Sequence, residues 1–126
     1  MAEIVLREDA FLVSETDLKG IITFANDEFI KVAGYTKEEL LGKNHNIVRH
    51  PDMPKAAFAD LWQTIKAGKT WTGFVKNRAK NGDFYWVYAT VVPTKGCDGS
   101  PTYLSSRKKA SAAEIAEAEA LYRTLN

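Results

Sequence analysis

The chain has 126 residues, of which 45% are hydrophobic and 26% are charged, a composition typical of one soluble globular domain. Seventeen basic residues against sixteen acidic ones leave a net charge of +1, which argues against nucleic acid as a partner. The single cysteine, Cys97, excludes an internal disulfide and any metal site made of cysteines alone. The use of only one cysteine also favours a reducing compartment. Apolar runs are short and the N-terminus lacks a signal-peptide core, so we expect no membrane span in this piece.

The N-terminal third predicts a hairpin followed by two short helices. Residues 11–15 and 20–24 are rich in β-forming side chains and flank a polar turn. A helix is predicted from Asn26 to Gly34, and a second one follows the capping sequence that begins at Thr36 and ends near Gly42. The next stretch, residues 43–53, shows no periodicity and holds both histidines of the chain.

A third helix is predicted to begin at Asp52 or Met53, with Pro54 in its first turn, where a missing N–H costs little. Gly68 ends it. Apolar side chains recur at helical spacing along it: Phe58, Leu61, Trp62 and Ile65. This helix is therefore expected to bury one face.

The C-terminal half predicts three strands and a closing helix. The strands cover residues 71–78, 83–92 and 102–108, with an Asn-Gly turn after the first and a stop at Pro93. A second capping sequence opens a helix over 111–125. Hairpins at both ends with helices between them predict an α+β fold, an antiparallel sheet with its helices on one face.

The residues show no catalytic motif, so we do not expect an enzyme. His45 and His50 lie five residues apart, with Asp52 close by. They could form a metal or heme site, or they could orient the loop backbone or touch a ligand; two histidines without thiolates are a weak metal signal. Cys97 lies in a polar turn and is interpreted as an incidental surface thiol.

Alternation along the strands at 71–78 and 83–92 sorts their side chains onto two faces. One face gathers mostly small residues: Trp71, Gly73, Val75, Asn77, Tyr85, Val87, Ala89 and Val91. This face has room for a flat ligand, although close packing of helices on the sheet also favours small residues. The other face carries Phe74, Phe84, Trp86 and Tyr88, which we expect to be covered by the terminal segments or by a partner.

Two specific motifs identify a family. The block VRHPDMP at 48–54 is followed by a helix and then by WTGFVKNRAKNGDFYWV at 71–87, while TDLKGIITFANDEF at 16–29 is a more general pattern. Together they resemble the FAD-binding PAS domain of aerotaxis receptors, over essentially residues 10–125. The resemblance implies the PAS fold, a five-stranded antiparallel sheet with short helices on one face and a C-terminal helix. It also implies a flavin ring between the sheet and the helices.

The resemblance also implies a set of cofactor-binding residues. They are Asn26, His45, Arg49, His50, Asp52, Phe58, Trp62, Trp71 and Asn77. Arg49 suits a phosphate oxygen, Trp71 offers a π-face, and Asn77 can donate to and accept from a flavin pyrimidine edge. For Asn26, a role as a helix N-cap is as good an interpretation as cofactor contact. For Phe58, a role as a core aromatic is equally good.

Blue-light LOV domains, a related flavin-binding PAS group, carry a reactive cysteine shortly after the glycine that ends the second helix. His45 occupies that position here, and Cys97 is far from it in the sequence. We therefore expect no cysteinyl-adduct photochemistry, and redox sensing is favoured.

The resemblance implies a non-catalytic sensor that binds FAD non-covalently and reports redox, oxygen or energy status in aerotaxis. Its expected partners are the HAMP and signalling domains of a full receptor, a second copy in a homodimer, and a respiratory electron donor. Its expected location is the cytoplasmic side of the inner membrane, as a fragment of the receptor. The expected division is an N-terminal cap (1–10), the PAS domain (11–109) and a connecting helix (110–126). The alternatives are a heme gas sensor using His45 or His50, a cofactor-free interaction module, and a small flavin reductase.

Overall fold

The computed structural model describes residues 2–125, so Met1 of the expected N-terminal cap and Asn126 of the expected connecting helix lie outside the described residues. In chain order the elements are β1 (Phe11–Thr16), β2 (Ile22–Ala25), α1 (Asp27–Ala33), α2 (Lys37–Leu40), the 3-10 helix η1 (His45–Val48), α3 (Lys55–Lys66), β3 (Trp71–Arg78), β4 (Phe84–Lys95), β5 (Pro101–Lys109) and α4 (Ala112–Arg123).

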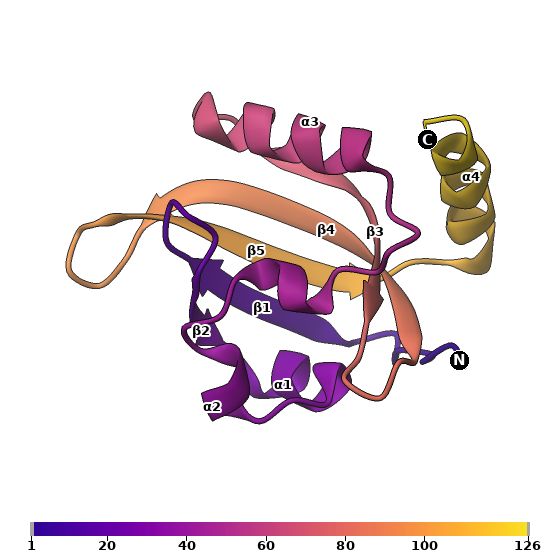
Figure 1. The fold of residues 1–126 in the computed structure, drawn as a ribbon, viewed down its shortest axis with the longest axis horizontal. Helices are drawn as coiled ribbons and strands as arrows, with labels where there is room; N and C mark the ends of the chain where they lie inside the picture. The colour runs from indigo at the N-terminus through magenta and orange to yellow at the C-terminus, as the bar shows by residue number, and fades with distance from the viewer. Residues whose placement is uncertain (1, 126) are drawn as a thin grey trace.

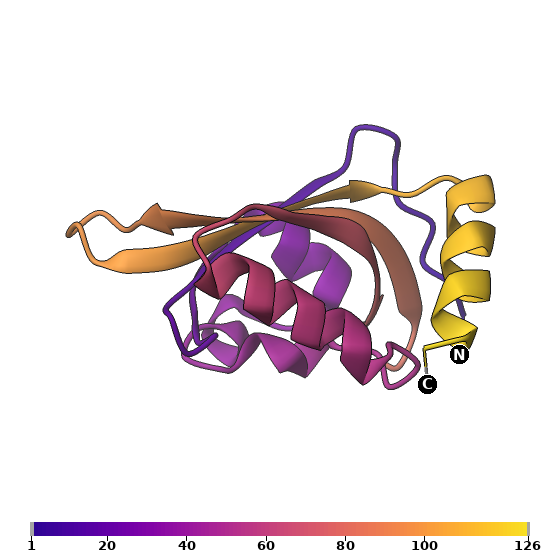
Figure 2. The ribbon, with the colours of Figure 1, turned by 90° about the horizontal axis from the view of Figure 1, so that it is seen from above.

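The strands form one antiparallel sheet in the order β2-β1-β5-β4-β3. Helices α1, α2, η1 and α3 lie on one side of this sheet, while α4 stands at its far end (Figures 1 and 2). The expected α+β architecture is confirmed, and the helix-covered side is called the inner face below. Within residues 2–125 no helix is both long and apolar enough to cross a membrane.

Local sequence signals explain the short helices. The Asn26 side chain accepts the Phe29 N–H at the start of α1, and Thr36 and Glu39 form a reciprocal capping box at the start of α2. Gly34 and Gly42 follow these helices with φ of 78° and 85°, a left-handed conformation that glycine adopts without a steric penalty. The two helices are therefore kept short.

Several predicted boundaries differ from the structure by a few residues, and two of the differences concern prolines. Helix α3 begins at Lys55, and Pro54 is its N-cap residue instead of a first-turn residue. Strand β4 continues past Pro93 to Lys95. Because β3 begins at Trp71, opposite Val91, one edge of β4 is unpaired beyond that residue. A strand tolerates proline at such a free edge, where no ladder bond needs its missing N–H.

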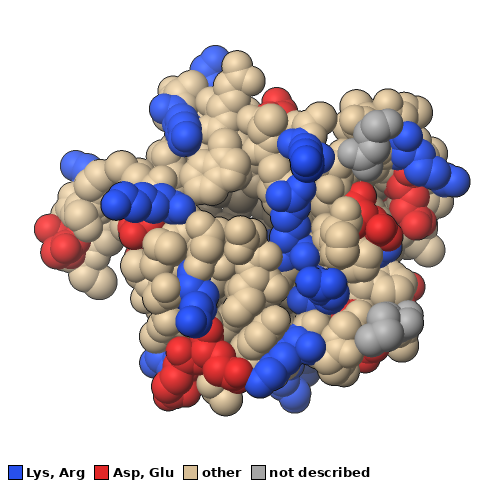
Figure 3. Space-filling model, viewed as in Figure 1, with Lys and Arg blue, Asp and Glu red and all other residues tan. Residues whose placement is uncertain are grey.

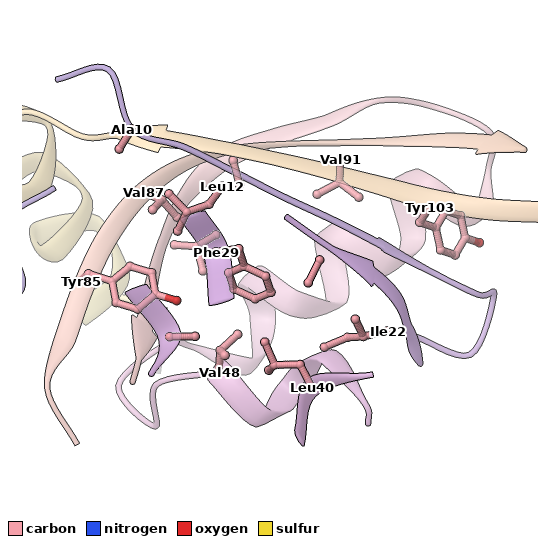
Figure 4. Packing of buried hydrophobic residues seen from close by; sticks show 14 of the residues in the cluster. Ala10, Leu12, Ile22, Phe29, Leu40, Val48, Tyr85, Val87, Val91 and Tyr103 are labelled. Atoms are coloured by element: carbon pink, nitrogen blue, oxygen red, sulfur yellow. The ribbon is translucent and has the colours of Figure 1, made fainter. Parts of the chain in front are cut away.

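The main core lies between the sheet and the helices α1, α2 and η1 (Figure 4). Leu12, Phe29, Leu40 and Val87 are fully buried there. The core fills this half of the inner face, and α3 covers the other half.

The outer face of the sheet is covered in part by the two terminal segments. Helix α4 packs on Trp86, which is buried, and Tyr122 of α4 stacks on it with ring centroids 6.2 Å apart. The Ile4 N–H donates to the Phe84 carbonyl, and the Phe84 N–H donates to Ala2. Residues 2–4 thus occupy the edge of β4 beyond its last pair with β5, at Val87.

Candidate functional site

A cavity of about 310 Å³ lies between α3 and the inner face of the sheet. The apolar side of α3 forms one wall, strands β3, β4 and β5 form the opposite wall, and η1 closes one end. Figure 3 shows this face of the molecule hollowed at its centre, with basic side chains bordering the hollow. The lining residues are Thr16, Gly20, Asn44, His45, Asn46, Arg49, Phe58, Leu61, Trp62, Ile65, Val75, Asn77, Ala89, Val91, Tyr103, Ser105 and Arg107.

Arg107 on β5 brings a positive charge to the floor of this cavity. Its guanidinium donates from Nη2 to Ser14 Oγ at 2.7 Å and from Nη1 to Ser105 Oγ at 3.0 Å, and it lies 4.4 Å from the ring centroid of Phe29. Among residues 2–125 no carboxylate forms an ion pair with it, and none of the described lining residues is acidic. Burial lowers the pKa of Arg107 to about 10, so it remains a cation at neutral pH.

His45, the first residue of η1, contacts the same guanidinium. Its Nε2 lies 3.0 Å from Arg107 Nη1 and 3.0 Å from Ser14 Oγ. Because a guanidinium only donates hydrogen bonds, Nε2 must accept, and the proton of the neutral ring resides on Nδ1. Burial, followed by the charge of Arg107, lowers the pKa of His45 to about 3. The ring is therefore neutral at physiological pH.

Two buried polar atoms in this region have no hydrogen-bond partner among the described residues: Arg107 Nε and Tyr85 Oη. The Tyr85 hydroxyl points into the core toward Phe29 (Figure 4). Burial raises the pKa of Tyr85 to about 12, against the opposing effect of Arg107. Unpaired buried donors such as these are rare in proteins and indicate an unmet hydrogen-bonding demand.

Of the residues expected to bind a cofactor, the structure brings one group together around the cavity: His45, Arg49, Phe58, Trp62 and Asn77. The Arg49 guanidinium lies 4.1 Å from the ring centroid of Phe58. The backbones of Arg49 and Asn77 form an isolated antiparallel bridge, which fixes these two residues side by side.

The remaining expected residues do not line the cavity. Asn26 caps α1, with its Oδ1 accepting from Val13 and its Nδ2 donating to Phe11, so it serves as the N-cap considered above. His50 and Asp52 are also absent from the lining, and the Asp52 carboxylate pairs with Lys76.

Trp71 lies between α3 and β3 and does not line the cavity. Its indole Nε1 donates to Asp60 Oδ2 of α3 at 2.8 Å. Its six-membered ring lies over Gly73, where an added Cβ would stand 2.6 Å from Trp71 Cη2. The small residue at 73 therefore makes room for this tryptophan.

The sequence interpretation missed Tyr103, Ser105 and Arg107, which share the inner face of β5. A signal was present, since alternation along β5 places these three residues on one face. Alternation alone does not say which face of β5 is buried. That depends on the pairing of β5 with β1 and β4.

Neither a metal cluster nor a thiol belongs to this site. No group of three or more His, Cys, Asp or Glu side chains within residues 2–125 is arranged to hold a metal ion. Cys97 is exposed in the β4–β5 turn and does not line the cavity.

Residues 22–106 match the sequence family described as the PAS fold. The chain belongs to the PAS family. This PAS domain is 55% identical over 121 residues to the aerotaxis receptor of Escherichia coli (strain K12), which is 96% of this chain and 24% of the receptor. It is 27% identical over 95 residues to the nitrogen fixation regulatory protein of Klebsiella pneumoniae, 75% of this chain and 19% of that protein. The chain thus spans about a quarter or less of these relatives.

Solved structures share the PAS fold with it. The dark structure of the blue-light photoreceptor Aureochrome1 LOV superposes with a TM-score of 0.75 at 19% identity, covering 90% of this chain and 85% of that one. The Rhodobacter sphaeroides LOV protein superposes with a TM-score of 0.70 at 22% identity, covering 88% and 65%. The expected family and fold are confirmed.

Proposed function

We propose that this PAS domain is a sensory module that binds FAD non-covalently in the cavity and reports redox, oxygen or energy status for aerotaxis. One observation carries the proposal: Arg107 presents a buried cation to a cavity whose described lining residues include no acid. A buried charge without a counter-charge costs free energy that an electron-rich ligand can recover. A flavin ring supplies such acceptors along its pyrimidine edge.

The residues present fit a flavin in shape and chemistry. A volume of about 310 Å³ lies at the lower end of the range for small-molecule sites, enough for a planar ring system but not for a whole dinucleotide. Asn77, 3% exposed, would bind the pyrimidine edge with its amide. Arg49, which lies next to Asn77 and over the ring of Phe58, would hold the phosphates that extend beyond the cavity.

The state of His45 argues against the heme alternative. A histidine that binds heme iron must present a free lone pair, and the Nε2 lone pair of His45 already accepts from Arg107 and Ser14. His50 lies outside the cavity, and its Nδ1 accepts the Asp52 N–H at 3.0 Å. Flavin is therefore favoured over heme on the contacts of both histidines.

A bound flavin supplies the one- and two-electron chemistry, and the protein supplies binding and electrostatics. Arg107 places positive charge where added electron density is stabilised. His45, neutral and held by two hydrogen bonds, orients the guanidinium without adding charge. Asn77 lies on β3 and Arg107 on β5, so a change in hydrogen bonding in the cavity acts on two strands of the sheet.

The wider role follows the aerotaxis receptor to which the chain is similar. We infer a non-catalytic domain on the cytoplasmic side of the inner membrane, followed by HAMP and signalling domains in a dimeric receptor, with a respiratory electron donor. The division into a cap (1–10), a PAS domain (11–109) and a connecting helix (110–126) belongs to the same proposal.

The proposal is tested on the purified chain by its absorption spectrum and by chromatography of the cofactor released with acid. We expect the flavin bands and FAD at close to one per chain. Replacing Arg107 with Met, which keeps an unbranched side chain but removes the charge, should reduce FAD affinity at least tenfold because a charge-assisted hydrogen bond is worth about 1.5–3 kcal/mol.

The matched control is Arg78→Met, because Arg78 is exposed and lies on β3 away from the cavity. It should bind FAD as the wild type does. A heme Soret band, or no uptake of FAD on reconstitution, would show that the proposed cofactor is wrong.

A further inference from the structure

Residues 49–53 lie along the free edge of β3 and are tied to the backbone of that strand. The His50 N–H donates to the Lys76 carbonyl at 3.4 Å, and the Lys76 N–H donates to Met53 Sδ at 3.3 Å. One residue away on each segment, Arg49 and Asn77 form the backbone bridge that borders the cavity. The position of Arg49 relative to Asn77 therefore depends on how this segment is held.

A cluster of side chains outside the cavity holds it. Lys76 Nζ lies 2.9 Å from Asp52 Oδ2 and 4.6 Å from the ring centroid of Phe84. His50 also contacts Phe84, edge to face at 6.1 Å. The Lys76 side chain is 13% exposed although it is charged, so its ammonium depends on Asp52 and the aromatic ring as its partners.

Strand alternation connects this cluster to the cavity. Lys76 and Asn77 are consecutive residues of β3, so their side chains point to opposite faces of the sheet. Asn77 lines the cavity, and Lys76 meets Asp52 on the other side. An anchor at Lys76 thus fixes the backbone on which Asn77 sits and the segment that carries Arg49.

We propose that Asp52 and Lys76 are positioning residues that set the affinity of the cavity for its ligand through Arg49 and Asn77, without touching the ligand. The inference rests on the proposed function, and it assigns Asp52 a different role from the direct cofactor contact expected from the sequence. It also gives Lys76, which was not among the expected site residues, a part in ligand binding.

The test is a double-mutant cycle on the full chain, with FAD affinity measured by titration of the apoprotein. Asp52→Asn and Lys76→Met each remove one charge of the pair. We expect each to weaken FAD binding about fivefold, the scale of a partly exposed ion pair. The double variant should lose no more than the worse single variant, because both substitutions break the same interaction.

The Lys80–Glu39 pair supplies a matched control. Lys80 Nζ lies 2.6 Å from Glu39 Oε2 and 5.9 Å from the ring centroid of Tyr35, and none of these residues lines the cavity. Lys80→Met and Glu39→Gln should therefore change FAD affinity less than twofold. Equal losses in this pair, unchanged affinity in the first pair, or a double variant that loses the product of the two single losses would each overturn the proposal.

Amide hydrogen exchange of the ligand-free protein separates this inference from the proposed function. In Asp52→Asn and Lys76→Met the amides of His50 and Lys76 should exchange faster than in the wild type, while those of α1 should not change. Unchanged exchange at His50 and Lys76 would overturn the positioning role even if FAD binds. If the wild type does not bind FAD, the proposal that FAD is the cofactor is wrong. The exchange result then decides the positioning role by itself.

Discussion

At the scale of single residues, Arg107 carries the main electrostatic feature of the molecule. Its contacts are two hydroxyls, one imidazole nitrogen and one aromatic ring, with Nε left unpaired among the described residues. These contacts orient the guanidinium but do not neutralise it. Under the proposed function, an electron-rich group of the ligand that accepts from this guanidinium would offset the free-energy cost of burying its charge.

The pH dependence of stability follows from the two histidines. Burial lowers the pKa of His45 to about 3, and burial is also the largest cause that lowers the pKa of His50. Unfolding restores the ordinary value of about 6.5, so the unfolded chain binds more protons below that pH. The stability that the two neutral histidines contribute is complete well above pH 6.5 and is lost as the pH falls toward 3. The free energy of unfolding should drop by about 1.4 kcal/mol for His45 alone between pH 7.5 and 5.5.

Urea unfolding of the ligand-free chain at the two pH values measures this drop. The variant His45→Gln keeps an acceptor for Arg107 and cannot titrate, so its loss over the same interval should be smaller. Equal stability of the wild type at pH 7.5 and 5.5 would contradict a neutral, buried His45.

Single residues also mark where sequence interpretation succeeds and where it stops. Asn77 could be placed at the ligand wall because β3 and β4 are joined by a short hairpin, so their register follows from local alternation. Arg107 could not, because its face is set by β1, more than ninety residues earlier, through the Ser14–Ser105 pairing. His50 and Asp52 share a motif with Arg49, yet the chain turns between them, and only Arg49 reaches the cavity.

At the scale of elements, α3 illustrates an ambiguity that periodicity cannot resolve. Its apolar stripe was expected to be buried, and Phe58, Leu61, Trp62 and Ile65 do face inward. They line a cavity, although Trp62 also meets Tyr103 of β5 with ring centroids 5.9 Å apart. The hydrophobic pattern is the same whether such a stripe lines a cavity or packs directly on a sheet. The Trp71 ring, which lies over Gly73 of β3 and donates to Asp60 of α3, connects the helix to the sheet beside the cavity.

Gly73→Ala should therefore destabilise the domain although alanine is ordinarily better than glycine in a strand. The new Cβ would stand 2.6 Å and 2.7 Å from two atoms of the Trp71 ring, and the hydrogen bond to Asp60 opposes withdrawal of that ring. We expect a loss of about 1–3 kcal/mol in the free energy of unfolding, typical of overpacking.

Thermal and urea unfolding measure this loss, with two comparisons. Gly96→Ala should be tolerated, because its nearest neighbour would be 3.4 Å away at ordinary contact distance. Trp71→Phe in the Gly73→Ala background should recover part of the loss by removing the clashing ring atoms. No loss in Gly73→Ala would show that the indole does not occupy this position.

At the scale of the whole molecule, the sheet separates two surfaces with different roles. The inner face holds the core and the cavity, and the outer face carries Trp86 under α4, together with Phe74 and Phe84. The expectation that terminal segments or a partner cover this outer face is met at Trp86 by α4. Elsewhere on the outer face Phe11 and Phe24 remain exposed.

Trp86→Ala should release α4 and leave the cavity intact. The substitution removes the apolar surface on which Ala118 and Tyr122 pack, and a helix of this length is marginal when it is not packed. Hydrogen exchange should accelerate over residues 112–123, while FAD content stays at the wild-type level. Tyr88→Ala, on the same strand and face but outside the α4 cluster, should leave α4 protected; unchanged protection in Trp86→Ala would contradict the packing role of this tryptophan.

The meeting of both terminal segments at one end of β4 has a mechanical consequence. Residues 2–4 bond to the backbone of Phe84, and α4 rests on Trp86, two residues further on (Figure 1). A force that pulls the two terminal segments apart therefore acts first on the few contacts at this end of β4, which break one after another. The long β4–β5 and β3–β4 ladders lie outside that line of force. We therefore expect the two terminal segments to detach from β4 at low force, before the strands that line the cavity are disturbed.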